Sequence, residues 1–122
     1  MAENIFICYP KCSTCQKAKK FLDSNKIDYV ERHIVTDTPS YEELKKIIEL
    51  SNIDINKFFN TSGILYRSMN LKEKLKELSY EEKIKLLSSN GMLIRRPILI
   101  SEKMILIGFK ETEWKGLIKK EN

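Results

Sequence analysis

The amino-acid sequence predicts one α/β domain, residues 1–122, built on a four-stranded mixed sheet. Three observations support this prediction. Apolar runs at residues 4–8 and 27–34 flank a segment of helical period, the pattern of a strand–helix–strand unit. Helical patterns fill residues 40–91. Near the C-terminus, two apolar runs separated by three polar residues predict a hairpin. We therefore expect the order β-α-β, a helical insertion, then β-β-α.

The first strand–helix–strand unit has recognisable boundaries. Residues 4–8 form a nearly continuous apolar run, which is typical of a buried strand. Ser13 followed by Gln16 matches a capping box, so the helix is expected to begin at about Ser13. Asn25 is expected to close it before the second strand at residues 27–34.

The middle of the chain carries signals of several short helices. Ser40 with Glu43, and Ser79 with Glu82, form two further capping boxes. Weaker signals are a cap at Asp54, a loop at residues 60–63, a leucine stripe at Leu71, Leu75 and Leu78, and a helix stop at Asn90-Gly91.

The pattern changes to strands after Pro97. Residues 98–100 and 104–107 are apolar runs joined by the three-residue loop 101–103, which predicts a β-hairpin. A last helix is expected to carry the stripe of Trp114, Leu117 and Ile118.

Composition indicates a monomeric cytoplasmic protein. Apolar residues make up 42% and charged residues 32% of the chain, as in ordinary globular domains. No apolar run reaches the length of a membrane span, and the N-terminus lacks the basic region of a signal peptide. The net charge of +5 comes from lysines interleaved with glutamates, so we expect neither nucleic-acid nor membrane binding.

Cys12 and Cys15 form a C-x-x-C pair at the start of the predicted helix. Amide groups and the helix dipole favour a thiolate there, so we expect a lowered pKa at Cys12. Cys15, one turn on, should be less exposed and less acidic, and would displace the partner bound to Cys12. Cys8 ends the first strand, where core packing is the expected role. One histidine and one C-x-x-C supply too few ligands for structural zinc.

The element order and the position of Pro97 favour a thioredoxin-like fold. A C-x-x-C pair beside a β-α-β pattern is a redox signature of that fold. In it, a proline before the third core strand follows a cis peptide bond and faces the first cysteine. Pro97, immediately before residues 98–100, matches that position.

Four blocks in this order make the chain similar to the arsenate reductase/Spx family within the thioredoxin-like superfamily. They are Tyr9–Ala18, Lys57–Gly63 with Tyr66-Arg67, Gly91–Ile98, and Gly108–Lys110. The resemblance covers almost the whole chain and is nearest to the branch that has C-x-x-C. It implies that Cys12 is the reactive thiol, and it implies no metal or bound organic cofactor. Glutathione, thioredoxin or a similar thiol would supply the electrons.

The same resemblance suggests an anion-binding site around the thiols. Arg96 matches the arginine that helps bind the oxyanion in the arsenate-reducing branch, and Pro97 follows it. The backbone N–H groups of Ser13 and Thr14 could also receive an anion. A plain capping role for Ser13 and a surface position for Arg96 are the simpler alternatives. That branch has a further arginine where this chain has Asn60, and no arginine follows Arg96.

The predicted function is thiol–disulfide oxidoreductase chemistry at Cys12 and Cys15, acting on a protein or small-molecule disulfide. The first alternative is an Spx-like redox-sensitive regulator that binds the C-terminal domain of the RNA polymerase α subunit. The second is a glutathione- or thioredoxin-linked arsenate reductase.

Overall fold

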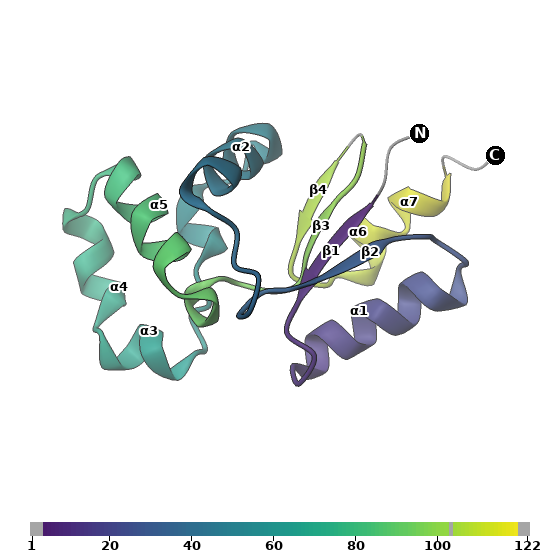
Figure 1. Ribbon diagram of the computed structural model, residues 1–122, viewed down its shortest axis with the longest axis horizontal. Helices are drawn as coiled ribbons and strands as arrows, with labels where there is room; N and C mark the ends of the chain where they lie inside the picture. The colour runs from purple at the N-terminus through teal and green to yellow at the C-terminus, as the bar shows by residue number, and fades with distance from the viewer. Residues whose placement is uncertain (1–3, 103, 120–122) are drawn as a thin grey trace. The chain divides into compact units, whose positions relative to one another are not determined.

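The computed structural model describes residues 4–102 and 104–119, which belong to two compact units (Figure 1). The first, here called the sheet unit, comprises the chain up to His33 and from Arg96 onward. The second, the helical unit, is Ile34–Arg95 and contains the predicted insertion at residues 40–91. Over the described residues, no helix has both the length and the apolar character needed to cross a membrane.

The sheet unit contains a mixed four-stranded sheet, as predicted. Its strands are β1 (Ile5–Cys8), β2 (Val30–His33), β3 (Ile98–Ile100) and β4 (Ile105–Ile107). They lie in the order β2-β1-β3-β4. β1 is parallel to β2, with Cys8 opposite His33, and antiparallel to β3, with Phe6 opposite Leu99. The hairpin of β3 and β4 is antiparallel.

Among the residues that the structure describes, the sheet unit also contains three helices: α1 (Ser13–Ser24), α6 (Glu111–Trp114) and α7 (Gly116–Lys119). Figure 1 shows them beside the sheet. One apolar cluster joins them to β1 and β3; its buried members are Phe6, Cys8, Cys15, Ala18, Leu22, Leu99, Trp114 and Leu117. The thiols therefore lie at one end of the core between α1 and the sheet.

β1 and β4 each begin one residue later than predicted, and two further elements of the sheet unit differ more from the prediction. β2 begins at Val30 rather than residue 27, because the Ile27 N–H donates to the Leu22 carbonyl and keeps that stretch in the turn after α1. The expected last helix is two short helices, since Lys115 lies between α6 and α7. Lys103, expected in the hairpin loop, lies outside the described residues.

The helical unit contains α2 (Tyr41–Ser51), α3 (Ile64–Ser68), α4 (Leu71–Lys74) and α5 (Tyr80–Ser89), with short 3-10 turns η1 (Ile55–Phe58), η2 (Leu75–Glu77) and η3 (Gly91–Leu93). The capping boxes predicted before α2 and α5 are both present. Asp54 caps η1, as predicted, by accepting from the Asn56 N–H at 2.8 Å. The leucine stripe does not form one helix, because the chain tightens from α4 into η2 and becomes extended at Leu78.

Gly91 is a position where a side chain has no room. An alanine methyl group would overlap the Ile34 carbonyl oxygen and lie 2.7 Å from the Ile34 carbonyl carbon. These are backbone atoms that cannot rotate away, so we expect Gly91→Ala to lower the free energy of unfolding by about 3 kcal/mol. Urea unfolding followed by circular dichroism measures this loss.

Gly116→Ala is the matched control, because the nearest atom to its added methyl group is the Met104 side-chain Cε at 3.5 Å, an ordinary contact. We expect it to change stability by less than about 1 kcal/mol. Equal losses in the two variants would contradict the steric argument.

Candidate functional site

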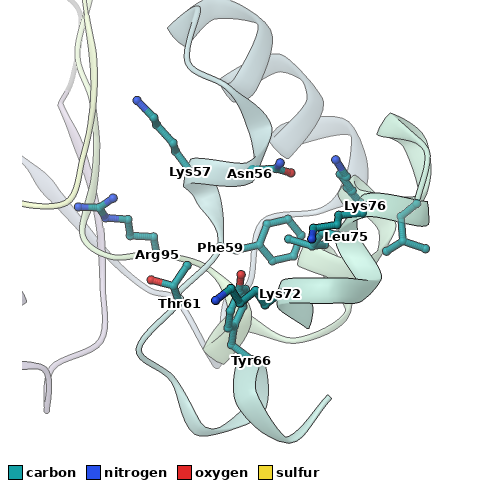
Figure 2. Close-up of a pocket in the computed structure, with 11 residues that line it drawn as sticks. Asn56, Lys57, Phe59, Thr61, Tyr66, Lys72, Leu75, Lys76 and Arg95 are labelled. Atoms are coloured by element: carbon teal, nitrogen blue, oxygen red, sulfur yellow. The ribbon is translucent and has the colours of Figure 1, made fainter. Parts of the chain in front are cut away.

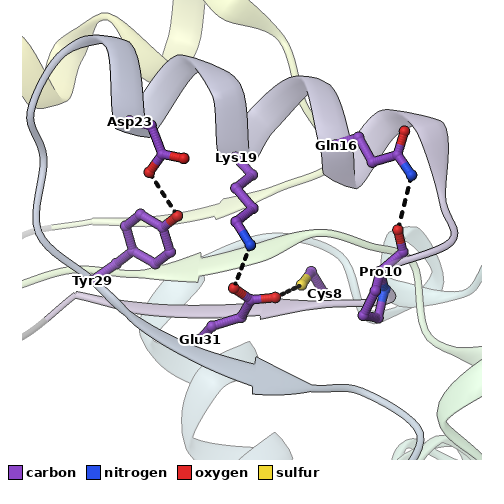
Figure 3. A network of polar contacts seen from close by, with 7 residues as sticks. All are labelled: Cys8, Pro10, Gln16, Lys19, Asp23, Tyr29 and Glu31. Carbon is purple, nitrogen blue, oxygen red and sulfur yellow. Dashed lines mark hydrogen bonds and ion pairs between the residues drawn. The ribbon is translucent and has the colours of Figure 1, made fainter.

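The C-x-x-C pair occupies the first turn of α1. Cys12 is the N-cap, with φ −83° and ψ 126°, and Ser13 is the first helical residue. The helix therefore begins where predicted, but the predicted capping box of Ser13 with Gln16 is wrong. Gln16 instead donates from Nε2 to the Pro10 carbonyl at 3.0 Å, which ties the helix to the preceding loop (Figure 3).

The thiols differ in exposure. Cys15 and Cys8 are each 2% exposed, whereas Cys12 is half-buried, and all three are free thiols. This confirms that Cys15 is the less exposed member of the C-x-x-C pair. It leaves Cys12 as the member that a substrate can reach.

The Cys15 sulfur is surrounded by groups that stabilise its thiolate. The neighbouring Cys8 thiol lowers the pKa of Cys15, and although burial opposes this effect, the pKa of Cys15 is about 7. The Tyr9 backbone N–H, 3.3 Å from Sγ, also lowers this pKa, as do the Cys12 thiol and the charge of Arg96. Because its pKa is lowered, Cys15 can act as a nucleophile although it is buried.

Cys15 is more acidic than its position in the helix predicts. Cys15 is expected from the sequence to be the less acidic thiol of the pair, and that order stays a prediction, but several separate groups lower the pKa of Cys15. The reason is geometric: the turn before α1 and the end of β1 both direct donors at Cys15, and helix position alone does not reveal them. The lowered pKa expected at Cys12 stays a prediction.

Cys8 does more than fill the core. Its burial in the apolar cluster confirms the expected packing role. In addition, its thiol donates to Glu31 Oε2 at 3.4 Å, and the other carboxylate oxygen, Oε1, accepts from Lys19 Nζ at 2.9 Å (Figure 3). The neighbouring Cys15 sulfur, burial and Glu31 together raise the pKa of the Cys8 thiol, which stays neutral.

Arg96 and Pro97 belong to the same end of the sheet unit. The peptide bond between them is cis, as expected for a proline in this position. The Arg96 guanidinium lies 5.2 Å from the centre of the Tyr9 ring, within reach of a cation–π contact. Ser13 is exposed and Thr14 half-buried in the first turn of α1. The structure thus places Arg96 beside the Cys12 loop, where its charge acts on Cys15.

Sequence reasoning missed Glu31, Lys19 and the backbone of Tyr9. The one available signal was a carboxylate inside the apolar run of the second strand. In the parallel pairing Glu31 lies opposite Phe6, two positions from the partner of Cys8. Pairing register, which the sequence does not state, is what brings Glu31 to the thiol.

The helical unit has a separate, cationic cavity of about 450 Å³ (Figure 2). Phe59 lies in its middle in this view, with Arg95 and Lys76 on opposite sides. None of the described residues that line it carries a carboxylate; its cations are Lys57, Lys72, Lys76, Lys83 and Arg95. Asn60 also belongs to this unit and donates from its side chain to the Met92 carbonyl at 3.5 Å.

The acidity of Cys15 is testable by titration. We expect a thiolate absorbance step at 240 nm with a midpoint of about pH 7 in the reduced protein, absent from Cys15→Ser. Because the pKa of Cys15 in the folded protein lies below its ordinary value of 9.0, the stabilisation of the fold by the thiolate is complete above pH 9 and is lost as the pH falls through 7. Between pH 6 and 8.5 the stability of the wild type should rise by about 2 kcal/mol relative to Cys15→Ser.

Urea unfolding at the two pH values measures that difference. A step near pH 7 that persists in Cys15→Ser and disappears in Cys12→Ser would assign the acidic thiol to Cys12 and contradict the argument.

The residues of the site lie within a recognisable family match. A model of the ArsC family matches residues 8–117. YusI, an uncharacterized protein of Bacillus subtilis, is 50% identical over 89% of this chain and 92% of its own length. The B. subtilis regulatory protein MgsR is 35% identical, over 95% of this chain and 90% of its own. The global transcriptional regulator Spx 2 of Bacillus anthracis is also 35% identical, over 84% of this chain and 76% of its own length.

Solved structures agree with this match. A protein of Bacteroides fragilis described as ArsC family related superposes with a TM-score of 0.92 at 50% identity, over 94% of this chain and 97% of that one. A possible arsenate reductase of Streptococcus mutans superposes with a TM-score of 0.85 at 42% identity, over 94% of this chain and 99% of that one. Both support the thioredoxin-like α/β fold found here. Among the described residues, no group of three or more His, Cys, Asp or Glu side chains could hold a metal ion.

Proposed function

Because this chain belongs to the ArsC family, we propose that it is a thiol–disulfide oxidoreductase with Cys12 and Cys15 as its redox pair. One observation carries this proposal. A half-buried thiol at the N-cap of α1 stands one turn before a buried thiol whose pKa is lowered to about 7. An accessible thiol followed by a protected, nucleophilic one is the arrangement that a two-step exchange requires.

The exchange proceeds in two balanced steps. The Cys12 thiolate attacks one sulfur of a substrate disulfide, forms a mixed disulfide and releases the other half as a thiolate. The Cys15 thiolate then attacks the Cys12 sulfur, releases the second half and closes the Cys12–Cys15 disulfide. Two electrons have passed to the substrate. An external thiol such as glutathione or thioredoxin returns them, so no bound cofactor is required.

The groups around Cys12 suit an anionic substrate or leaving group. Arg96 supplies a fixed positive charge, and the N–H groups of Ser13 and Thr14 lie in the first turn of α1, where helix N–H groups have no partner within the helix. We propose that these three residues, with Pro97, bind the substrate beside Cys12. Glutathione-linked disulfides, which carry carboxylates, fit this chemistry.

The direct test is to oxidise the protein with a small disulfide and map the product. Peptide mass analysis should show one disulfide in the protein, joining Cys12 to Cys15. Steady-state assays with glutathione as donor should show saturable reduction of the small disulfide by the protein. Oxidation that yields only intermolecular disulfides, with no turnover, would overturn the proposal.

A redox-sensitive regulator is the second candidate, favoured by the regulatory relatives MgsR and Spx 2. In this case the Cys12–Cys15 disulfide would be a switch and the partner would be the C-terminal domain of the RNA polymerase α subunit. Capture of that domain by one redox form only, together with negligible turnover, would favour this function over the enzyme.

Arsenate reduction is the third candidate, favoured by the similarity to the S. mutans protein. Arsenate-dependent consumption of glutathione or thioredoxin would support it. The chain has Asn60 in the helical unit where an arginine is expected for that activity, so we rank it last.

A further inference from the structure

The cavity of the helical unit has a charge pattern that the sequence does not suggest. Residues 34–95 contain ten lysines and arginines and nine aspartates and glutamates, so the unit as a whole is close to neutral. Five of those ten cations nevertheless line one cavity of about 450 Å³, and its described lining residues include no carboxylate (Figure 2). A solvated face ordinarily mixes both signs, so this separation indicates a site that favours anions.

Helical geometry explains how interleaved charges become separated. The signs alternate along residues 72–77, yet Lys72, Leu75 and Lys76 line the cavity because residues three and four apart share a helix face. Among the described residues, Lys76 is the one cation of the five that forms an ion pair, with Glu73 Oε1 at 3.3 Å. Both side chains of that pair are exposed, so it holds Lys76 only weakly.

The five cations converge from separate segments, two of which are fixed to each other by backbone hydrogen bonds. The segments are η1 for Lys57, α4 for Lys72, η2 for Lys76, α5 for Lys83 and the loop after η3 for Arg95. Phe59 and Ile94 form an antiparallel bridge, and the Arg95 N–H donates to the Phe58 carbonyl at 2.8 Å beside it. The backbone that carries Arg95 is therefore in place before any ligand binds, which lowers the entropic cost of binding.

The cavity also has an apolar lining. Phe59 and Leu75 are 1% and 6% exposed, and Tyr66 and Leu78 are half-buried. Figure 2 shows the Phe59 ring between the sides that carry Arg95 and Lys76. A volume of about 450 Å³ is ordinary for a small-molecule site. The lining therefore suits a ligand that joins a flat apolar body to several closely spaced negative charges.

We propose that this cavity binds a phosphorylated small molecule of nucleotide size. Its aromatic body lies against Phe59 and Tyr66, and its phosphates lie among the lysines and Arg95. A phosphate group carries about 1.5 to 2 negative charges and three acceptor oxygens, so a diphosphate meets several cations within a small volume. This inference is independent of the proposed oxidoreductase function, since Cys12, Cys15 and Arg96 are not among the described lining residues.

The test is a calorimetric titration of the reduced full chain with ADP, and separately with pyrophosphate and adenosine, which represent its two halves. We expect saturable binding of one ADP per chain. Pyrophosphate should bind about tenfold more weakly because it lacks the base that stacks on an aromatic ring, and adenosine should show no saturable binding. Added salt should weaken ADP binding, because it screens exposed charges.

Lysines on the same helices supply matched controls. Lys72→Gln and Lys83→Gln each remove a cation from the lining and should weaken ADP binding by about tenfold, as expected for one hydrogen bond to a charged group. Lys74→Gln and Lys85→Gln change the net charge equally, two residues farther along α4 and α5 and outside the described lining. They should leave the affinity within about twofold, because screening weakens the effect of more distant charges.

Tyr66→Ala tests recognition of the aromatic body. It should weaken ADP binding by about tenfold and leave pyrophosphate binding unchanged, because it removes a ring but no cation. The substituted side chains are all exposed or half-buried, and circular dichroism checks that each variant folds.

Several outcomes would overturn the proposal. They are no saturable ADP binding, equal affinity for ADP and pyrophosphate, and equal weakening by Lys72→Gln and Lys74→Gln. Saturable binding of a hexaglutamate peptide but not of ADP would identify a docking surface for an acidic protein segment instead. Weakening of ADP binding by Arg96→Gln but not by Lys72→Gln would assign the nucleotide to the thiol site.

Discussion

Replacing Cys12 with serine is expected to lower disulfide reduction by about a thousandfold or more, because a serine hydroxyl does not ionise at neutral pH and cannot form the mixed disulfide. Cys15→Ser should block a later step: Cys12 still attacks, but the mixed disulfide persists. The two variants therefore differ in what accumulates, although both lose turnover. Intact-mass analysis after exposure to oxidised glutathione separates them.

The expected masses are the unmodified chain for Cys12→Ser and one glutathione adduct for Cys15→Ser. Cys12→Ser keeps Cys8 and Cys15, so a glutathione adduct on either of these buried thiols would be visible as modification of that variant. Retention of wild-type turnover by Cys12→Ser would contradict its assignment as the attacking thiol, whatever the behaviour of Cys15→Ser.

Trp114→Ala should lower the free energy of unfolding by about 3–5 kcal/mol, the largest loss expected in the core. Trp114 is fully buried and makes edge contacts with Phe6 and Phe109, with ring centres 6.3 and 5.1 Å away. Its indole N–H donates to the Gly108 carbonyl at 3.1 Å. Alanine would leave a cavity and remove that buried donor. Because Trp114 is the sole tryptophan, unfolding must be followed by circular dichroism.

Trp114→Phe is the control for that variant. It keeps an aromatic ring in the same cluster but loses the N–H donor, so we expect a loss of about 1–3 kcal/mol from the unsatisfied Gly108 carbonyl and the smaller ring. If Trp114→Ala is as stable as Trp114→Phe, the packing of the aromatic ring contributes little to the free energy of unfolding.

Local patterns predicted most of the elements. The helices after Ser40 and Ser79 begin where their capping boxes place them, because a cap depends on side chains only three residues from the backbone groups they satisfy. The strands of the mixed sheet and the cis peptide bond before Pro97 were likewise expected. The same kind of pattern was misleading at Ser13, where Cys12 is the N-cap and Gln16 binds the loop instead.

The chemistry of the thiols depends on contacts between residues far apart in the chain. Spacing alone identified Cys12 and Cys15 as a pair, and burial confirmed which of them is protected. The groups that tune Cys15 could not be identified in this way: Cys8 bonds a carboxylate 23 residues away, and Arg96 lies over the Tyr9 ring. A pKa responds to charges, donors and solvent through space, and these are set by strand register and helix packing. Sequence periodicity carries no such information, so the contact between Cys8 and Glu31 became visible only once the sheet had brought β1 and β2 together.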